Sequence, residues 1–147
     1  MRLYLDACCL SRLTDNQGQT RIRAEADAVE RILELVWEER VVWVSSAVLE
    51  IEIGRNPDPD RRRDVAALLP YASEVVVPST AEADRAEFLE GLGFGTFDAL
   101  HLACAESGAV DVFLTTDDGL LRRARRHAGR LRLLVENPLS WNQEVAP

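Results

Sequence analysis

Short apolar runs alternate with longer amphipathic stretches along the chain. The runs typical of strands cover residues 2–6, 41–44, 74–77, 111–115 and 131–135. Between the first two runs, residues 21–39 place Ala28, Ile32, Leu35 and Val36 on one face at helical spacing, with Glu and Arg opposite. Apolar strands separated by helices predict a parallel sheet that is covered on both faces. We therefore expect one α/β domain over residues 1–147, with a five-stranded parallel sheet flanked by helices.

Residues that favour helix starts follow several of these strands. The expected N-cap residues are Ser45 or Ser46, Asp58 ahead of Pro59, Ser79 or Thr80, and Thr96. Gly54 ends the helix after the second strand, and Gly108 ends the helix expected over residues 97–106. Right-handed crossovers between the strands then fix the general layout.

Four carboxylates form one group in this layout. Asp6 is the last residue of the first strand, and Asp117 follows the end of the fourth. Glu50 lies one turn inside the helix after the second strand, and Asp98 lies in the first turn of the helix over residues 97–106. Ligands of open parallel sheets bind beyond the carboxyl ends of the strands. We therefore expect all four acids to face the same edge of the sheet.

Such a group of carboxylates requires a cation or a bound proton, because the negative charges otherwise repel one another. Hard oxygen ligands favour Mg²⁺ or Mn²⁺, and these ions can activate water for attack on a phosphodiester. Taken singly, Asp98 and Asp117 are also explained as first-turn helix acids, and Asp6 as a turn cap. Glu50 stands between two apolar residues and is harder to explain without a site. The joint pattern therefore favours a metal site.

Other polar residues close to these positions have more ordinary explanations. Asp118 competes with Asp117 for the fourth place in the group. Glu52 and Asp111 are more typical of structural or exposed acids. His101 falls on the apolar face of its helix, where a histidine is more often a satisfied core residue than a lone ligand.

The net charge of −8 argues against a simple nucleic-acid-coating protein, which would usually be basic. All 17 basic residues are arginine, whose planar fork suits phosphate oxygens, and they cluster within residues 61–63 and 122–132. Solvated helix faces paired with the many acids explain these clusters at least as well. The odd count of three cysteines favours reduced thiols in a cytoplasmic protein. We expect no membrane span and no secretory signal, because the chain has neither pattern.

Four segments together resemble the PIN domain family. They are Leu5-Asp6-Ala7-Cys8-Cys9-Leu10, Ser45-Ser46-Ala47-Val48-Leu49-Glu50, Phe97-Asp98-Ala99-Leu100-His101-Leu102-Ala103 and Leu114-Thr115-Thr116-Asp117. Their order and spacing fit over essentially the whole chain, and the third segment is the most specific. The resemblance implies a ribonuclease that depends on Mg²⁺ or Mn²⁺. Many small PIN proteins of this size are similar to the VapC toxins of bacterial toxin–antitoxin pairs, so RNA would be the substrate and an antitoxin protein a partner.

The same resemblance implies roles for individual residues. The residues expected to act are Asp6, Glu50, Asp98 and Asp117 as catalytic metal ligands, with Thr115 and Arg12 in substrate binding. Asp6 and Asp98 would bind the metal directly, whereas Glu50 would bind it directly or through water. Asp117 would complete the second side of the pocket. Thr115 would donate a hydrogen bond to a carboxylate or to a substrate phosphate.

The segment after Asp6 departs from the family pattern. Cys8 and Cys9 stand where the family often has a small polar residue, so a supporting hydroxyl is expected to be missing. A thiol phosphatase would need a longer spacing between cysteine and Arg12, and a haloacid-dehalogenase-like phosphatase would need an acid where Cys8 stands. The remaining alternative is a catalytically silent PIN-like module that binds a partner protein. Four intact acids favour catalysis, because gathered charge is costly without a cation.

A homodimer is a further expectation. The helices after the first strand carry Leu10, Leu13 and Ile22, which we expect at the edge of the sheet. Apolar residues at that place would suit a contact between two copies of the chain.

Overall fold

A computed structural model describes residues 1–145 of the chain. In this part of the chain, five parallel strands form one sheet in the order β3-β2-β1-β4-β5. The strands are β1 (Arg2–Leu5), β2 (Val42–Ser46), β3 (Glu74–Val76), β4 (Val112–Leu114) and β5 (Leu134–Glu136). The predicted α/β fold with a five-stranded parallel sheet is thus confirmed.

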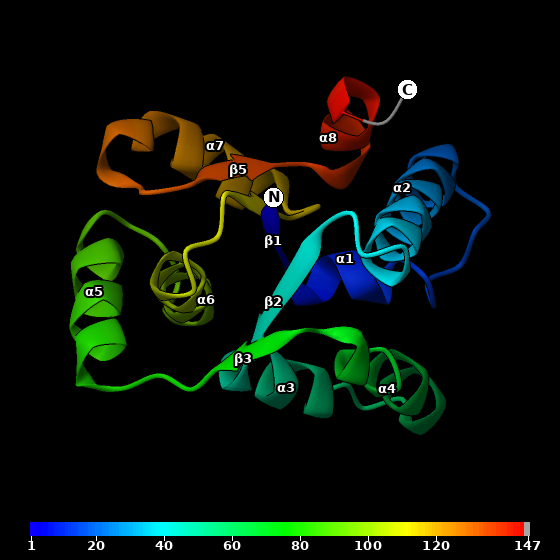
Figure 1. The fold of residues 1–147 in the computed structure, drawn as a ribbon, viewed down its shortest axis with the longest axis horizontal. Helices are drawn as coiled ribbons and strands as arrows, with labels where there is room; N and C mark the ends of the chain where they lie inside the picture. The colour runs from blue at the N-terminus through cyan, green and yellow to red at the C-terminus, as the bar shows by residue number, and fades with distance from the viewer. Residues whose placement is uncertain (146–147) are drawn as a thin grey trace.

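Helices flank this sheet (Figure 1). Within residues 1–145 they are α1 (Ala7–Ser11), α2 (Thr20–Trp37), α3 (Ala47–Gly54), α4 (Pro59–Ala66), α5 (Thr80–Gly91), α6 (Thr96–Ser107), α7 (Asp118–Arg126) and α8 (Pro138–Val145), with short 3₁₀ turns at Leu69–Tyr71 and Ala128–Arg130. Across the described residues, every helix is too short or too polar to cross a membrane.

β1 occupies the centre of the sheet, between β2 and β4. Leu3 of β1 is paired with Trp43 of β2 and with Val112 of β4. The chain therefore moves outward from β1 to β3, returns to β4 on the other side of β1, and moves outward again to β5. Ligands of such sheets bind where the strand order reverses, beyond the carboxyl ends of the strands. Asp6 and Thr115, which directly follow β1 and β4, lie at this place.

α5 and α6 lie on one side of the central strands, and α1 and α2 lie on the other (Figure 1). The end of α6 comes very close to the sheet, since a Cβ at Gly108 would stand 2.8 Å from a methyl group of Val44 and 3.2 Å from one of Val76. Glycine is therefore required at this contact. Because α6 leads from the carboxyl edge back to the start of β4, its first turn, which contains Asp98, lies at the carboxyl edge.

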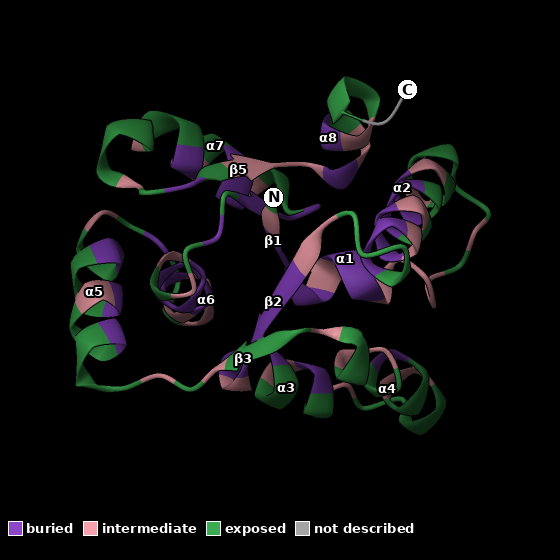
Figure 2. Cartoon of the chain, viewed as in Figure 1, coloured by how far each residue is buried: buried purple, intermediate pink, exposed green. Residues whose placement is uncertain are grey.

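The core is formed by the central strands and by the buried faces of the helices that pack on them, above all α2 and α6 (Figure 2). Tyr4, Trp43 and Phe113 have no exposed area, and the rings of Tyr4 and Phe113 stack with centroids 5.1 Å apart. Burial of such side chains contributes about 2–3 kcal/mol each to folding. The residues at the carboxyl edge of the sheet are therefore supported by a tightly packed core.

The predicted helix starts are partly confirmed. The hydroxyl of Ser46 accepts a hydrogen bond from the amide of Leu49 at 3.1 Å, and Asp58 caps α4 with proline in the first turn, as expected. Thr96 is not the N-cap of α6, because the helix begins one residue earlier than expected. Gly95 has the extended backbone of a cap, and its carbonyl oxygen accepts the first intrahelical hydrogen bond at 2.8 Å.

Two expectations from the apolar pattern are wrong. The fifth strand covers Leu134–Glu136 instead of residues 131–135, because the chain first forms the 3₁₀ turn at Ala128–Arg130. Leu10 is fully buried in the core and is therefore not part of an apolar surface for a second copy. The homodimer itself stays a prediction.

Candidate functional site

Asp6 is the central acid of the site. It caps α1, because its Oδ1 accepts a hydrogen bond of 2.8 Å from the amide of Ala7. Its Oδ2 accepts a hydrogen bond of 2.8 Å from the hydroxyl of Thr115. The side chain of Asp6 is buried, so groups that follow two neighbouring strands fix both carboxylate oxygens.

The thiol of Cys8 takes the place of the supporting hydroxyl that was expected to be missing. Its Sγ lies 3.4 Å from Oδ2 of Asp6 and 3.3 Å from the hydroxyl of Thr115. It also accepts a hydrogen bond from the amide of Thr116 at 3.3 Å. A thiol is a weak donor and a weak acceptor, but it meets the same partners that a hydroxyl would meet. Cys8 therefore completes the contacts around Asp6.

α3 brings Glu52, and not Glu50, to the site. A carboxylate oxygen of Glu52 lies within 4.8 Å of both a carboxylate oxygen of Asp6 and a ring nitrogen of His101, whereas Glu50 is exposed. Two residues along an α-helix are about 200° apart, so the two side chains leave α3 in opposite directions. The expected position of Glu50 in the pocket is therefore wrong, and so is the view of Glu52 as only structural or exposed.

His101 is buried beside Glu52 and has no exposed area. Its Nε2 lies 2.9 Å from Oε2 of Glu52, and its Nδ1 lies 2.6 Å from the hydroxyl of Tyr4. Burial lowers the pKa of His101, but the hydrogen bond to Glu52 and the charge of Asp6 raise it by more, so the pKa lies above its ordinary value. The predicted core histidine with both nitrogens bonded is found, and its partner belongs to the acidic cluster.

Asp98 lies in the first turn of α6, and its environment disfavours the charged form. Burial, followed by the charges of Asp6 and Asp117, raises the pKa of Asp98 to about 6, although His101 acts in the opposite direction. Burial also raises the pKa of Asp6, and His101 and Thr115 offset part of this rise. The structure thus brings Asp6, Asp98 and Asp117 into one electrostatic environment that favours a proton or a cation.

The two neighbouring acids at the start of α7 have different partners. Asp117 caps the helix, because its Oδ1 accepts hydrogen bonds of 2.9 and 3.1 Å from backbone amides of the first turn. Both carboxylate oxygens of Asp118 pair with the guanidinium of Arg21 at 2.8 Å. Asp117 acts on the pKa of Asp98, so Asp117 is the candidate for the fourth acid.

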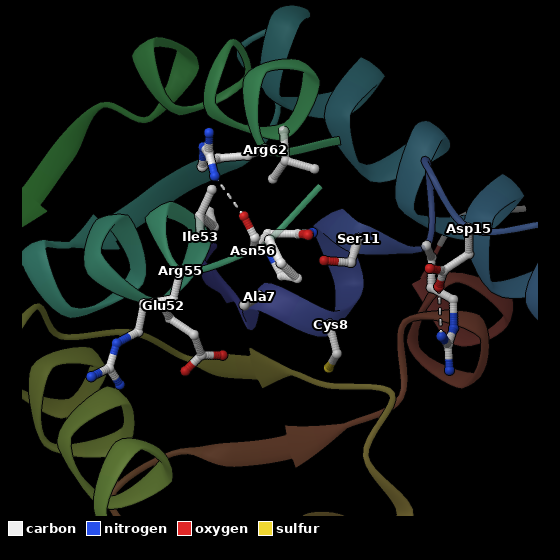
Figure 3. A pocket seen from close by; sticks show the side chains of 12 residues that line it. Ala7, Cys8, Ser11, Asp15, Glu52, Ile53, Arg55, Asn56 and Arg62 are labelled. Atoms are coloured by element: carbon white, nitrogen blue, oxygen red, sulfur yellow. Dashed lines mark hydrogen bonds and ion pairs between the residues drawn. The ribbon is translucent and has the colours of Figure 1, made fainter. Parts of the chain in front are cut away.

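A pocket of about 490 Å³ opens beside Glu52 (Figure 3). Cys8 and Glu52 line it from α1 and α3, and Arg55 and Arg62 line it as well. Arg55 lies over the ring of Phe97, with 5.1 Å between the guanidinium carbon and the ring centroid. The pocket therefore combines cationic groups with one edge of the acidic cluster.

Arg12 lines the same pocket, but ion pairs hold its guanidinium. Its Nε lies 2.9 Å from Glu25 and its Nη1 2.8 Å from Asp15. Glu25 is 1% exposed and also accepts hydrogen bonds from Arg21 at 3.3 Å and from Asn137 at 2.6 Å. These ion pairs give Arg12 a structural role at the wall of the pocket, and its role in substrate binding stays a prediction.

Two residues of the cluster were missed from the sequence, although signals for both exist. Glu52 follows the buried Val48 by four residues and so shares its face of α3. His101 follows Asp98 by three residues on α6, and residues at this spacing are neighbours on a helix. Helical spacing measured from Val48 and from Asp98 would have identified both.

The comparisons with known proteins agree with this architecture. The family model described as PIN domain matches residues 3–126. A search of curated proteins finds no match to the chain. Among solved structures, FitAcB from Neisseria gonorrhoeae aligns with a TM-score of 0.60 at 16% identity, covering 92% of this chain and 97% of that chain.

Two further solved structures share the fold. VapBC-1 from nontypeable Haemophilus influenzae aligns with a TM-score of 0.61 at 17% identity, covering 94% of this chain and 98% of that chain. VapC20 of Mycobacterium tuberculosis, described as a Sarcin-Ricin loop cleaving toxin, aligns with a TM-score of 0.55 at 17% identity, covering 80% of this chain and 92% of that chain. At these identities the likeness is one of fold.

Proposed function

This chain belongs to the PIN domain family, and we propose that it is an endoribonuclease that depends on Mg²⁺ or Mn²⁺ and acts as the toxin of a toxin–antitoxin pair. The VapC proteins that it resembles in fold include one described as a Sarcin-Ricin loop cleaving toxin. That description supports RNA as the class of substrate for the present chain.

The observation that carries this proposal is the convergence of acids at the carboxyl edge of the sheet. Asp98 has a pKa of about 6, raised by burial and by the charges of Asp6 and Asp117. A divalent cation would relieve this repulsion, and hard oxygen donors favour Mg²⁺ and Mn²⁺. Asp6, Glu52 and Asp98 would hold the ion, with Asp117 as the fourth acid of the cluster. When bound, such an ion would help to activate water and to stabilise the leaving oxygen of a phosphodiester.

The residues around the acids would prepare the site for substrate. Thr115 and Cys8 hold Asp6 through contacts of 2.8 and 3.4 Å, so that its carboxylate stays oriented. Arg55 and Arg62 line the pocket beside Glu52, and guanidinium groups suit phosphate oxygens. We assign the RNA backbone to this pocket, with binding that weakens as salt concentration rises.

The partner of this nuclease would be an antitoxin protein, as the resemblance to VapC toxins implies. Uncontrolled cleavage of RNA would harm the cell, so the site would be kept blocked until it is needed. The three free thiols, at Cys8, Cys9 and Cys104, fit a reducing compartment, and we propose the cytoplasm as the location.

Cleavage assays with a matched pair of variants test the proposal. Purified protein is incubated with single-stranded and structured RNA, with Mg²⁺, with Mn²⁺ or with EDTA. We expect cleavage only with a divalent ion, and a loss on the order of 100-fold for Glu52→Gln and for Asp98→Asn. Glu50→Gln is the control, since Glu50 is exposed on the same helix and should keep full activity.

Four outcomes would count against this proposal. Cleavage that survives EDTA would exclude the metal mechanism, as would cleavage that survives both Asp6→Asn and Asp98→Asn. Equal effects of the substitutions at positions 50 and 52 would show that the placement of Glu52 is irrelevant to activity. Absence of cleavage under every condition, together with tight binding of a protein partner, would favour the catalytically silent binding module.

A further inference from the structure

A chain of hydrogen bonds runs from the core of the protein to the acidic cluster. The hydroxyl of Tyr4 lies 2.6 Å from the hydroxyl of Ser46 and 2.6 Å from Nδ1 of His101. The Nε2 of the same imidazole lies 2.9 Å from Oε2 of Glu52. Ser46, Tyr4 and His101 are each 0% exposed, whereas Glu52 reaches the pocket. These hydrogen bonds therefore connect a buried tyrosine on β1 to an acid at the site.

The acceptor groups in this series of hydrogen bonds determine which atom donates in the bond between His101 and Glu52. A carboxylate oxygen of Glu52 can only accept, so Nε2 of His101 must carry a hydrogen and donate it. The hydroxyl of Ser46 already accepts a hydrogen bond from the amide of Leu49, so it can donate its own hydrogen to Tyr4. Tyr4 then donates to Nδ1 of His101. In this arrangement every donor in the chain has an acceptor, as a buried polar network requires.

Packing keeps the imidazole in this orientation. The ring of Tyr4 stacks on Phe113 with an interplanar angle of 10°, and it meets His101 edge-on at 5.6 Å between centroids. Neither ring has exposed area into which it could rotate. The Nε2 hydrogen of His101 is therefore aimed at one fixed point, which is the carboxylate of Glu52.

Glu52 needs such a constraint more than Asp6 and Asp117 do. The oxygens of Asp6 are held by a backbone amide and by Thr115, and Asp117 is held by the first turn of α7. Glu52 has a longer side chain on the rim of an open pocket, where free rotation would turn its carboxylate toward solvent. Its carboxylate has one hydrogen-bond partner among the side chains of residues 1–145, and that partner is His101.

We propose that His101 is a positioning residue, which holds the carboxylate of Glu52 toward Asp6, and that Tyr4 locks His101 in the required orientation. This inference rests on the proposed function, because the oriented carboxylate is the one that would bind the metal ion. A direct role of His101 as a ligand is disfavoured, since both ring nitrogens are already hydrogen-bonded. Outer partners that orient a ligand typically change metal affinity by about 10–100-fold when removed.

Mn²⁺ binding measured by calorimetry tests this proposal without reference to activity. We expect His101→Leu to weaken Mn²⁺ binding about tenfold. His101→Gln should stay within about threefold of the wild type, because its amide can still donate to Glu52. His127→Gln is the matched control, as it changes the second histidine of the chain, which packs beside Phe94. Tyr4→Phe keeps the ring and the packing but removes the hydroxyl that orients His101. It therefore tests the proposal if His101→Leu does not fold.

Combination with Glu52→Gln separates positioning from general stability. If His101 acts through Glu52, its substitution has no further effect on Mn²⁺ affinity once Glu52→Gln is present. An equal loss in both backgrounds would overturn the proposal, and so would unchanged affinity in His101→Leu and Tyr4→Phe. A wild-type protein that binds no Mn²⁺ would instead refute the proposed metal-dependent function. The nitrogen resonances of His101 would then still report whether Nε2 carries a hydrogen bonded to Glu52.

Discussion

The hydroxyl of Thr115 donates a hydrogen bond of 2.8 Å to Oδ2 of Asp6, across 109 positions of the sequence. The same hydroxyl accepts a hydrogen bond of 3.1 Å from the amide of Asp117. One side chain thus connects the acid that follows β1 with the acid that caps α7. This connection is possible because β1 and β4 are neighbours in the sheet.

Substitution of Thr115 by valine should therefore affect both stability and the site. We expect the free energy of unfolding to fall by about 2 kcal/mol, because a buried carboxylate oxygen and a backbone amide lose their partner. Cleavage of RNA should fall at least tenfold, since Asp6 is no longer oriented. Urea unfolding and cleavage rates measure the two effects. Thr116→Val is the control, and an equal loss in that variant would contradict the assigned role of Thr115.

The raised pKa of Asp98 predicts how the metal-free protein responds to pH. In the folded state this pKa is about 6, whereas its ordinary value is 3.8. Between these values the folded protein retains a proton that the unfolded chain has lost, so the free energy of unfolding falls as the pH rises from about 4 to 7. We expect a contribution on the order of 1 kcal/mol, because solvent screens a partly exposed group.

Urea unfolding of the metal-free protein at several pH values measures this slope. Asp98→Asn should show a smaller decrease over the same range, since asparagine does not titrate. Asp6, whose pKa is also raised, contributes in the same direction and remains in both proteins. Identical slopes for the wild type and Asp98→Asn would rule out Asp98 as the source.

Glu25 should be one of the most sensitive positions outside the acidic cluster. Its carboxylate is 1% exposed and bonds to Arg12, Arg21 and Asn137. Replacement by alanine leaves the partly buried Arg12 and Asn137 without their acceptor, and we expect a loss of about 3 kcal/mol in the free energy of unfolding. Arg63→Ala, which removes exposed ion pairs only, should cost less than about 0.5 kcal/mol. Chemical unfolding of both variants decides whether this network is structural.

The thiol of Cys8 should be the most reactive one and should respond to metal. It lines the pocket, whereas Cys9 and Cys104 are buried, and burial raises the pKa of Cys104 to about 11. Alkylation with N-ethylmaleimide, followed by mass spectrometry, should modify Cys8 first and more slowly when Mn²⁺ is present. Cys8→Ser should keep RNA cleavage within about threefold of the wild type, because a hydroxyl meets the same partners. Modification of Cys104 before Cys8 would contradict this arrangement.

The sequence was sufficient to predict the elements and the edge of the sheet at which the acids meet. Asp6 and Asp98 could be placed because each adjoins a strand end or a helix start, and the carboxyl ends of parallel strands share one edge. The positions within α3 were not predicted correctly. Glu50 and Glu52 are separated by one residue, so the choice between them depends on which face of the helix packs against the sheet, and Val48 indicates that face.

Contacts between distant segments were beyond sequence reasoning. The ion pair between Arg12 and Glu25 could not be predicted, because Glu25 lies on another helix and becomes a neighbour of Arg12 only when α1 and α2 pack together. The link between Tyr4 and His101 likewise requires α6 to cross over β1. The local pattern of apolar and polar residues predicts each helix or strand, whereas these contacts depend on how several helices and strands pack together.

The position of β1 between β2 and β4 also affects how the protein acquires its site during synthesis. A growing chain on the ribosome that ends before Val112 has no β4, so neither Thr115, the partner of Asp6, nor Asp117 has yet been added. Contacts across so long a separation also form slowly, since the loop between them must close first. A nascent chain of this protein therefore stays without its assembled acidic cluster until most of its length has left the ribosome.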